Sequence, residues 1–335
     1  MSKLKNKAFL LRLAGTLIAL FLLIYLLSQQ GWASILAALQ MIPLRTLVFA
    51  FGLVIISRFA VIARWHVLMR ATEIEIPFGQ TVRITFAGLF ATNFLPTTVG
   101  GDVVRLAGAV RLKYDAALAT ASLIADRLVG MAGMAITLPW GIPALVELFE
   151  QAGPSIEFFP GGLVTSALLP KSLSRLWQKS LAFFAHTWNA LKIYIKKPAS
   201  LILALLYTGV HMACTFTMLY ILFKSQGQTV SWTLIAGLYS LVYFITLLPV
   251  SINGYGLQEI SMTFIFSKAA GVTLESSLSV ALILRTMMML ASLPGAFFLS
   301  GILAGDSPGV VASEGGVTSQ DSSGGISRSK NRPES

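Results

Sequence analysis

The chain has 335 residues, of which 55% are hydrophobic and only 12% are charged, and its mean hydropathy is +0.76. Several apolar stretches reach the roughly 20 residues that a helix needs to span a bilayer, so the composition excludes a soluble globular protein. The net charge of +11 does not indicate nucleic-acid binding, because the basic residues are scattered between apolar stretches. We therefore expect an all-α, polytopic integral membrane helix bundle whose basic residues set its topology and contact anionic lipids.

Two spans are predicted at the start of the chain. Residues 8–27 form an apolar stretch longer than a typical signal-peptide core, and the lysines before it place the N-terminus in the cytoplasm. A second span is expected over residues 44–61. Three arginines are expected at its cytoplasmic end: Arg58, Arg64 and Arg70.

A segment broken by proline and glycine follows, over residues 79–110, with Asn93 at its tip. Pro96 disfavours a helical conformation at the residue before it and removes a backbone donor. Gly100 and Gly101 permit a turn that other residues adopt only at a cost. Lipid cannot satisfy the backbone groups that such a break exposes, so we expect a re-entrant hairpin surrounded by protein or by a water-filled cavity.

The next long apolar stretch, residues 116–149, contains the adjacent pair Asp126-Arg127. Neighbouring residues on a helix point about 100° apart, so these two side chains cannot pair well with each other. Either each one faces a partner inside the bundle, as costly intramembrane charges usually do, or the pair lies at the membrane surface.

The remaining predicted elements are a surface helix and three spans. Residues 171–197 form a basic amphipathic segment that fits a helix lying on an anionic cytoplasmic surface. Spans are expected over residues 200–223, 232–248 and 274–303, and the last of these contains Arg285. Together with the earlier elements they predict one membrane domain, residues 1–304, of about six to eight spans plus two re-entrant hairpins. The Gly/Ser-rich polar tail, residues 305–335, is expected to be disordered.

The broken segment recurs in the second half of the chain. Residues 248–254, with the sequence LPVSING, align without gaps on residues 95–101, LPTTVGG. Charged residues follow both copies, Asp102 and Arg105 after the first and Glu259 after the second; Asp102 and Arg105 are three residues apart, on one face if a helix restarts there. Two broken hydrophobic segments in corresponding places point to a transporter-like site at the bilayer midplane, although two ordinary loops could share these turn residues.

The two copies could be inverted repeats, and that arrangement has a defined topology. The first hairpin would then enter from the cytoplasm, the second would enter from outside, and both termini would be cytoplasmic. The inverted-repeat topology requires residues 116–170 to cross the membrane twice. If they cross once, the hairpins face the same way.

Signatures of enzymes, metals and cofactors are absent from the sequence. The three histidines are isolated, the single Cys214 lies in an apolar stretch, and no nucleotide, phosphate-loop or nucleophile motif is found. We therefore expect no catalytic residue, no bound metal and no cofactor. Seven charges look buried: Arg83, Asp102, Arg105, Asp126, Arg127, Glu259 and Arg285.

Arginines outnumber carboxylates among these charges, four to three, and arginine binds phosphate bidentately while being weakly hydrated. This excess predicts a site for the headgroup of a phospholipid. The candidate headgroup-binding residues are Asn93, Pro96, Gly100, Gly101, Asp102, Arg105, Asp126, Arg127, Asn253, Gly254, Glu259 and Arg285.

The order of these motifs resembles the lysylphosphatidylglycerol synthase transmembrane (flippase-like) family. It is carried by NFLP…GGDxxR at residues 93–105, by Asp126-Arg127, by LPxSxNGxGxxE at residues 248–259 and by Arg285, and it covers about residues 8–304. In that family, bifunctional members join this domain to a soluble aminoacyl-transfer domain, and the membrane part is thought to move aminoacylated lipid between leaflets. Other members are standalone, some of them associated with lipid-linked glycan or hopanoid pathways. We expect a standalone member that lacks the synthase domain, so lysyl transfer is not assigned.

Three functions remain open at this point. The first is a flippase-like transporter in the bacterial cytoplasmic membrane that binds a phospholipid or polyprenyl-phosphate-type lipid and moves it between leaflets. Its ligand would be an anionic or aminoacylated phospholipid, or a lipid-linked phosphate. The second is a non-catalytic membrane partner of a lipid-modifying or lipid-linked glycan enzyme. The third is a membrane enzyme acting on a lipid-linked substrate, with Asp102 or Glu259 as the base.

Overall fold

The computed structural model describes residues 40, 42–93, 95, 100–152, 192–194, 196–247 and 256–304. Over these residues the protein is helical and contains four helices long and apolar enough to cross a membrane. The expected class, an all-α polytopic membrane protein, is thereby confirmed. Four predictions fall outside the described residues: the first span, the basic segment up to residue 191, the tip of the second broken segment and the C-terminal tail.

The chain order of the helices is long, short, short, long, and this order occurs twice. The first series is α3 (Leu44–Ala71), α4 (Phe78–Thr92), α5 (Gly100–Arg111) and α6 (Ala116–Thr137), followed by the 3₁₀-helix η1 (Leu138–Gly141) and α7 (Ile142–Ala152). The second series is α9 (Pro198–Ser225), α10 (Trp232–Thr246), α11 (Leu257–Ala269) and α12 (Leu274–Ser292), followed by α13 (Pro294–Ala304).

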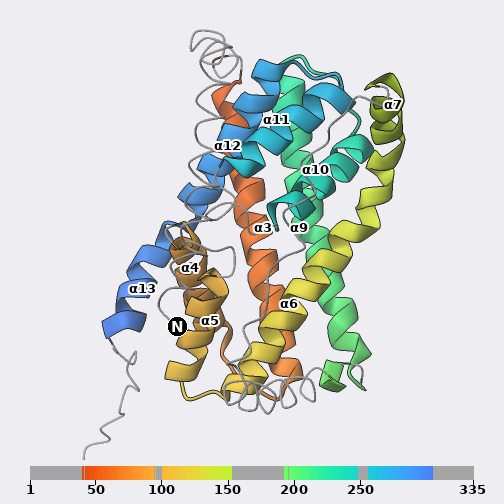
Figure 1. Ribbon diagram of the computed structural model, residues 1–335. Coiled ribbons are helices and arrows are strands. Elements are labelled where there is room, and N and C mark those ends of the chain that lie inside the picture. Colours follow the sequence, from red (N-terminus) through yellow and green to blue (C-terminus); the bar gives the residue numbers. More distant parts are fainter. Residues whose placement is uncertain are drawn as a thin grey trace, which may run out of the picture.

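The helices α3 and α9 pack side by side along their length and run in opposite directions (Figure 1). Each has 28 residues and is therefore about 42 Å long, more than the roughly 30 Å of the hydrocarbon core. The Lys197 side chain, at the start of α9, donates a hydrogen bond to the carbonyl of Ala71, at the end of α3. The largest hydrophobic core lies around α9, α10 and α12, with Phe216, Leu219 and Phe266 fully buried.

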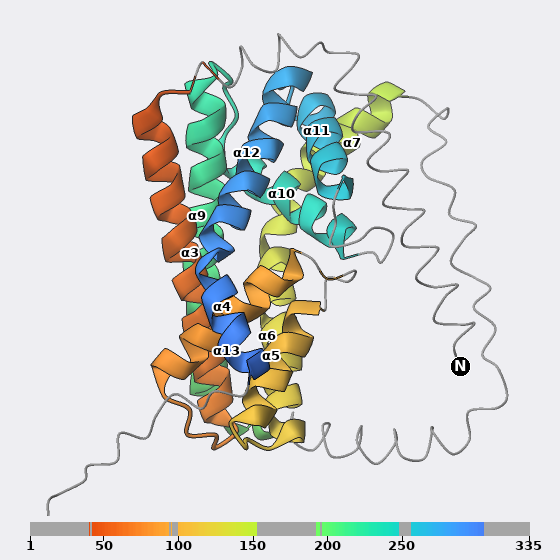
Figure 2. The same ribbon diagram turned by 90° about the vertical axis from the view of Figure 1, so that its left-hand side faces the viewer.

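The two pairs of short helices lie toward opposite ends of the bundle. In both views α4 and α5 are in the lower half, whereas α10 and α11 are in the upper half (Figures 1 and 2). The four helices have 15, 12, 15 and 13 residues, or at most about 23 Å, so none is long enough to cross a bilayer alone. The matching lengths support inverted repeats, which stay a prediction.

The expected end of the second span near residue 61 is wrong, because α3 continues to Ala71. The turns after Arg64 still bury apolar side chains, including Trp65, Leu68 and Met69, and the carboxylate of Asp126 neutralises the charge of Arg64 inside the bundle. Arg58 and Arg64 therefore lie within the helix rather than at its cytoplasmic end. The expectation that Arg83 is buried is also wrong, since its side chain on α4 is exposed.

Glycines allow the closest helix contacts in the bundle. A Cβ at Gly237 of α10 would overlap with the backbone of Trp140 and Gly141 in η1, and a Cβ at Gly295 of α13 would overlap with the carbonyl of Phe86 in α4. Small residues at such contacts let helix backbones approach closely, which strengthens packing where lipid provides no hydrophobic driving force.

Gly237→Ala is expected to destabilise the folded protein by roughly 1–3 kcal/mol or more, because the added methyl group must push α10 away from η1. The melting temperature of the purified protein in detergent measures the effect. The matched control is Gly209→Ala on α9, where an added Cβ would meet nothing within 4 Å. Equal melting temperatures for the two variants would contradict the close contact between α10 and η1.

Candidate functional site

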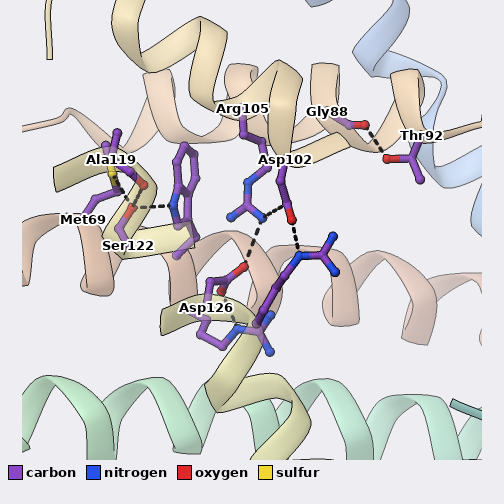
Figure 3. Close-up of polar contacts among 11 residues, drawn as sticks. Met69, Gly88, Thr92, Asp102, Arg105, Ala119, Ser122 and Asp126 are labelled. Atoms are coloured by element: carbon purple, nitrogen blue, oxygen red, sulfur yellow. Dashed lines mark hydrogen bonds and ion pairs between the residues drawn. The ribbon is translucent and has the colours of Figure 1, made fainter. Parts of the chain in front are cut away.

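Five charged side chains from α3, α5 and α6 form a continuous chain of ion pairs. Arg64 Nε donates to Asp126 Oδ1 at 2.6 Å, and Arg105 Nη1 donates to Asp126 Oδ2 at 3.0 Å. The same Arg105 nitrogen donates to Asp102 Oδ1 at 3.1 Å, and Arg127 Nε donates to Asp102 Oδ2. Figure 3 shows Arg105 on α5 between the two carboxylates. The structure thus brings together four of the sequence-predicted residues and adds Arg64.

Local sequence explains how these side chains reach one another. Because α5 begins at Gly100, Asp102 and Arg105 lie in its first two turns on one face. The adjacent residues Asp126 and Arg127 of α6 diverge, so that Asp126 pairs with Arg64 of α3 whereas Arg127 pairs with Asp102 of α5. Asp126, which is only 2% exposed, therefore faces partners inside the helix bundle, as one of the two alternatives predicted.

Glycines also shape the hairpin that carries the site. A Cβ at Gly88 of α4 would lie 2.8 Å from Arg105 Cγ, and a Cβ at Gly101 would overlap with the Thr92 hydroxyl. The α4 and α5 helices can therefore approach closely enough for Arg105 to pass over α4. Pro96, between the two helices, lies outside the described residues.

Arg105 is held on a third side by an aromatic ring. Its guanidinium carbon lies 4.2 Å from the centre of the Trp65 ring, and Trp65 Nε1 donates to Ser122 Oγ at 3.1 Å, which orients the ring. Arg105 is only 7% exposed. Carboxylates on two sides and a π face on the third offset the desolvation of this cation.

A cavity of about 190 Å³ opens beside the charged residues. All five of them line it, and the rest of its lining is Val61, Gly130, Met134, His211 and Tyr243. The volume is below the roughly 300–1,000 Å³ of pockets for drug-sized ligands, so the cavity fits a headgroup rather than a whole lipid. Three arginines and two aspartates leave its lining with a net charge of +1, apart from His211.

His211 and Tyr243 supply the neutral polar groups of this cavity. His211 Nδ1 lies 2.6 Å from the hydroxyl of Ser57, and this hydrogen bond fixes the orientation of the imidazole ring. Tyr243 of α10 is close enough to Arg64 and Arg127 to interact with their charges. The second half of the chain therefore contributes to the same cavity.

A second, separate ion pair joins α11 to α12. Arg285 Nε donates to Glu259 Oε1 at 2.6 Å, and neither residue lines the cavity. Glu259 is the third residue of α11, as Asp102 is of α5, so the two pairs occupy corresponding places in the two series of helices.

The other residues predicted for the site lie outside the cavity lining or outside the described residues. Asn93 ends α4, and its side-chain amide donates to the Ser292 hydroxyl of α12 at 2.8 Å. Asn253 and Gly254 lie outside the described residues. Among the residues that the structure describes, no group of three His, Cys, Asp or Glu side chains could hold a metal ion.

Sequence reasoning missed Arg58, Arg64, His211 and the two tyrosines. Arg58 Nη2 lies 2.7 Å from the sulfur of Met288, inside the bundle. One signal was present: apolar residues continue after Arg64, with Val67, Leu68 and Met69, which is typical of a helix that continues. The tyrosines gave no such signal, because Tyr239 and Tyr243 lie within an apolar helix whose sequence does not show which face lines a cavity.

The comparisons with known proteins agree with this description. The family model described as the lysylphosphatidylglycerol synthase TM region matches residues 12–295. The matched range contains both broken segments and every charged residue of the two ion-pair groups. A search of curated proteins finds no match.

Proposed function

This chain belongs to the lysylphosphatidylglycerol synthase TM region family, and from that premise we propose that it binds a phosphate-bearing lipid headgroup and moves the lipid between leaflets. One observation carries the proposal: three arginines converge on one cavity inside a membrane helix bundle. Charges within a bilayer are expensive, and those that are retained usually serve a substrate or ion pathway.

The chemistry of the cavity suits a phosphate group. Arg64, Arg105 and Arg127 present planar guanidinium groups, which match phosphate oxygens in geometry and lose little hydration on binding. Asp102 and Asp126 hold these guanidinium groups in place, so little ordering remains to be done when the ligand arrives. The acyl chains would stay in the surrounding lipid, since the cavity holds only a headgroup.

The arrangement of the short helices supports movement in addition to binding. The two pairs of short helices lie toward opposite ends of the bundle, and Tyr243 of α10, in the second series of helices, lines the arginine cavity. Rocking of one series of helices against the other would open the cavity to one leaflet and then to the other. We propose that the protein does this in the bacterial cytoplasmic membrane, without catalysing a covalent reaction.

A non-catalytic partner of a lipid-modifying enzyme is the competing proposal. It is supported by the same ion pairs, because they join α3, α5 and α6 and so lock helices together. The enzyme proposal is weaker, since both candidate bases are paired with arginines: Asp102 accepts from Arg105 and Arg127, and Glu259, which is only 3% exposed and does not line the cavity, accepts from Arg285.

Lipid movement in proteoliposomes tests the proposed function. Purified protein is reconstituted with a trace of fluorescent phosphatidylglycerol or fluorescent polyprenyl phosphate, and a membrane-impermeant quencher reports the outer-leaflet fraction with time. We expect faster equilibration between leaflets than in protein-free liposomes, for at least one of the two lipids. No acceleration for either lipid, with bound lipid absent as well, would favour the helix-locking partner.

The proposed orientation of the bundle can be tested separately. One end of the bundle carries more basic residues than the other. At the end where α3 stops and α9 starts the described residues include Arg70, Arg111, Lys113, Lys192, Lys196 and Lys197; at the other end they include Arg45, Lys224 and Lys268. The excess of basic residues supports a cytoplasmic position for the first end.

Single cysteines measure this orientation, with Cys214→Ser as the background. Lys113→Cys and Thr229→Cys place thiols at exposed loop positions near opposite ends of the bundle. We expect an impermeant maleimide to label Thr229→Cys in intact cells and to label Lys113→Cys only after permeabilisation. The reverse pattern would invert the proposed orientation, and labelling of both in intact cells would contradict the placement of the two loops.

A further inference from the structure

The donors, acceptors and net charge of the cavity lining indicate which headgroup charge the cavity can accept. We infer that it takes a headgroup with net negative charge, a phosphate ester without compensating ammonium groups, and that it discriminates against a cationic aminoacylated phospholipid. This inference rests on the proposed function and narrows its substrate class.

The first observation is that every carboxylate oxygen of the cavity already accepts a hydrogen bond from an arginine. Asp102 Oδ1 accepts from Arg105 and Asp102 Oδ2 accepts from Arg127. Asp126 Oδ1 accepts from Arg64 and Asp126 Oδ2 accepts from Arg105. An ammonium group of a ligand would have to share one of these oxygens with an arginine, which would place two cations next to each other in the same small cavity.

The second observation is a surplus of donors. Arginine has five N–H groups, and those on Nε and Nη2 of Arg105 are buried and make no hydrogen bond. A buried donor without an acceptor costs about 1–3 kcal/mol, and more when it is charged. Phosphate oxygens bring acceptors to this cavity, whereas an ammonium group brings further donors.

The net charge of the cavity lining also favours an anionic headgroup over a cationic one. With three arginines and two aspartates it is +1, so a phosphodiester such as that of phosphatidylglycerol makes the occupied cavity neutral. Lysyl-phosphatidylglycerol carries one phosphate and two ammonium groups, which would raise the total to +2 in a region of low dielectric constant.

The remaining carboxylate does not change this conclusion. Glu259 Oε2 makes no hydrogen bond and could accept one from an amine. However, Glu259 is only 3% exposed and does not line the cavity, so an ammonium group bound there cannot reach it without rearrangement of α11.

Native mass spectrometry of the full chain in neutral detergent can test this inference. The probes are equimolar short-chain phosphatidylglycerol, farnesyl phosphate, short-chain phosphatidylethanolamine and short-chain lysyl-phosphatidylglycerol. We expect at least one anionic probe to bind about tenfold or more tightly than lysyl-phosphatidylglycerol, with the zwitterion between them. Whether phosphatidylglycerol or farnesyl phosphate is favoured identifies the source of the phosphate.

Variants of Arg127 link that preference to the cavity. Arg127→Gln lowers the net charge of the lining to zero and should reduce the ratio of affinities between the anionic probes and lysyl-phosphatidylglycerol. Arg127→Glu lowers that charge to −1 and should make lysyl-phosphatidylglycerol the more tightly bound lipid. Arg127 suits this test because its side chain is 36% exposed, so that Arg127→Gln leaves no fully buried charge without its partner. Arg83→Ala, on the exposed side of α4, is the control that should keep the wild-type preference.

Two outcomes distinguish failure of the inference from failure of the proposed function. Equal or tighter binding of lysyl-phosphatidylglycerol, with that binding sensitive to Arg127→Gln, would leave a headgroup site and overturn its anionic selectivity. Binding of none of the four probes, or binding that Arg127→Gln leaves unchanged for all of them, would overturn the proposed headgroup site and the inference with it.

Discussion

Asp126→Ala is expected to lower the free energy of unfolding by about 3–5 kcal/mol, the largest loss that we expect from any single substitution in the site. The aspartate is 2% exposed and accepts hydrogen bonds from both Arg64 and Arg105. Removing it leaves two buried cations without this partner, and their desolvation is no longer offset. The melting temperature in detergent, read from the reaction of Cys214 with a thiol dye on unfolding, would show a large decrease.

One further variant separates the charge of Asp126 from its size, and a second variant is a control for the loss of stability. Asp126→Asn keeps the size of the side chain and should still lose most of the stability, because the negative charge is what Arg64 and Arg105 require. Asp115→Ala is the matched control on the same helix: its carboxylate caps α6 by accepting from the backbone N–H groups of Ala117 and Leu118. That cap contributes about 1 kcal/mol. A smaller loss for Asp126→Ala than for Asp115→Ala would show that the ion-pair chain does not hold the bundle together.

Arg127→Gln is expected to slow lipid movement in proteoliposomes about tenfold or more while leaving most of the stability intact. A charge-assisted hydrogen bond contributes about 1.5–3 kcal/mol, and the most exposed arginine of the cavity would lose its bonds to a bound phosphate. Its partly exposed ion pair with Asp102 contributes at most about 1 kcal/mol to folding, because water and counterions screen it.

The comparison with Arg83→Gln makes the Arg127 result specific. Both variants remove one positive charge from the same half of the protein, but Arg83 is exposed on α4 and lies outside the cavity. Wild-type lipid movement by Arg127→Gln, at equal reconstituted amounts, would remove Arg127 from the proposed headgroup site. Equal slowing by both variants would point to a general effect of surface charge on association with anionic lipid.

Composition and the positions of proline and glycine were sufficient to predict the class and the helix break between α4 and α5. Apolar stretches of roughly 20 residues with few charges predict membrane-spanning helices whatever tertiary contacts those helices make. The pairing of Asp102 and Arg105 on one face also follows from their spacing, since residues three apart on a helix are neighbours wherever the helix lies.

Only the tertiary structure decided which charges meet. In a helix as uniformly apolar as α3, sequence periodicity does not distinguish the face that lies against α6 from the face that lies against lipid, so Arg64 looked like an end marker. Its partner Asp126 is 62 residues away, and their contact exists because α3 and α6 pack against each other. Likewise, a charge in a broken segment can point inward or outward, and the packing of α4 against α5 and α13 leaves Arg83 exposed while Arg105 is buried. Local sequence sets backbone breaks and spacing along one helix, whereas the neutralisation of a buried charge depends on the long-range contact that supplies its partner.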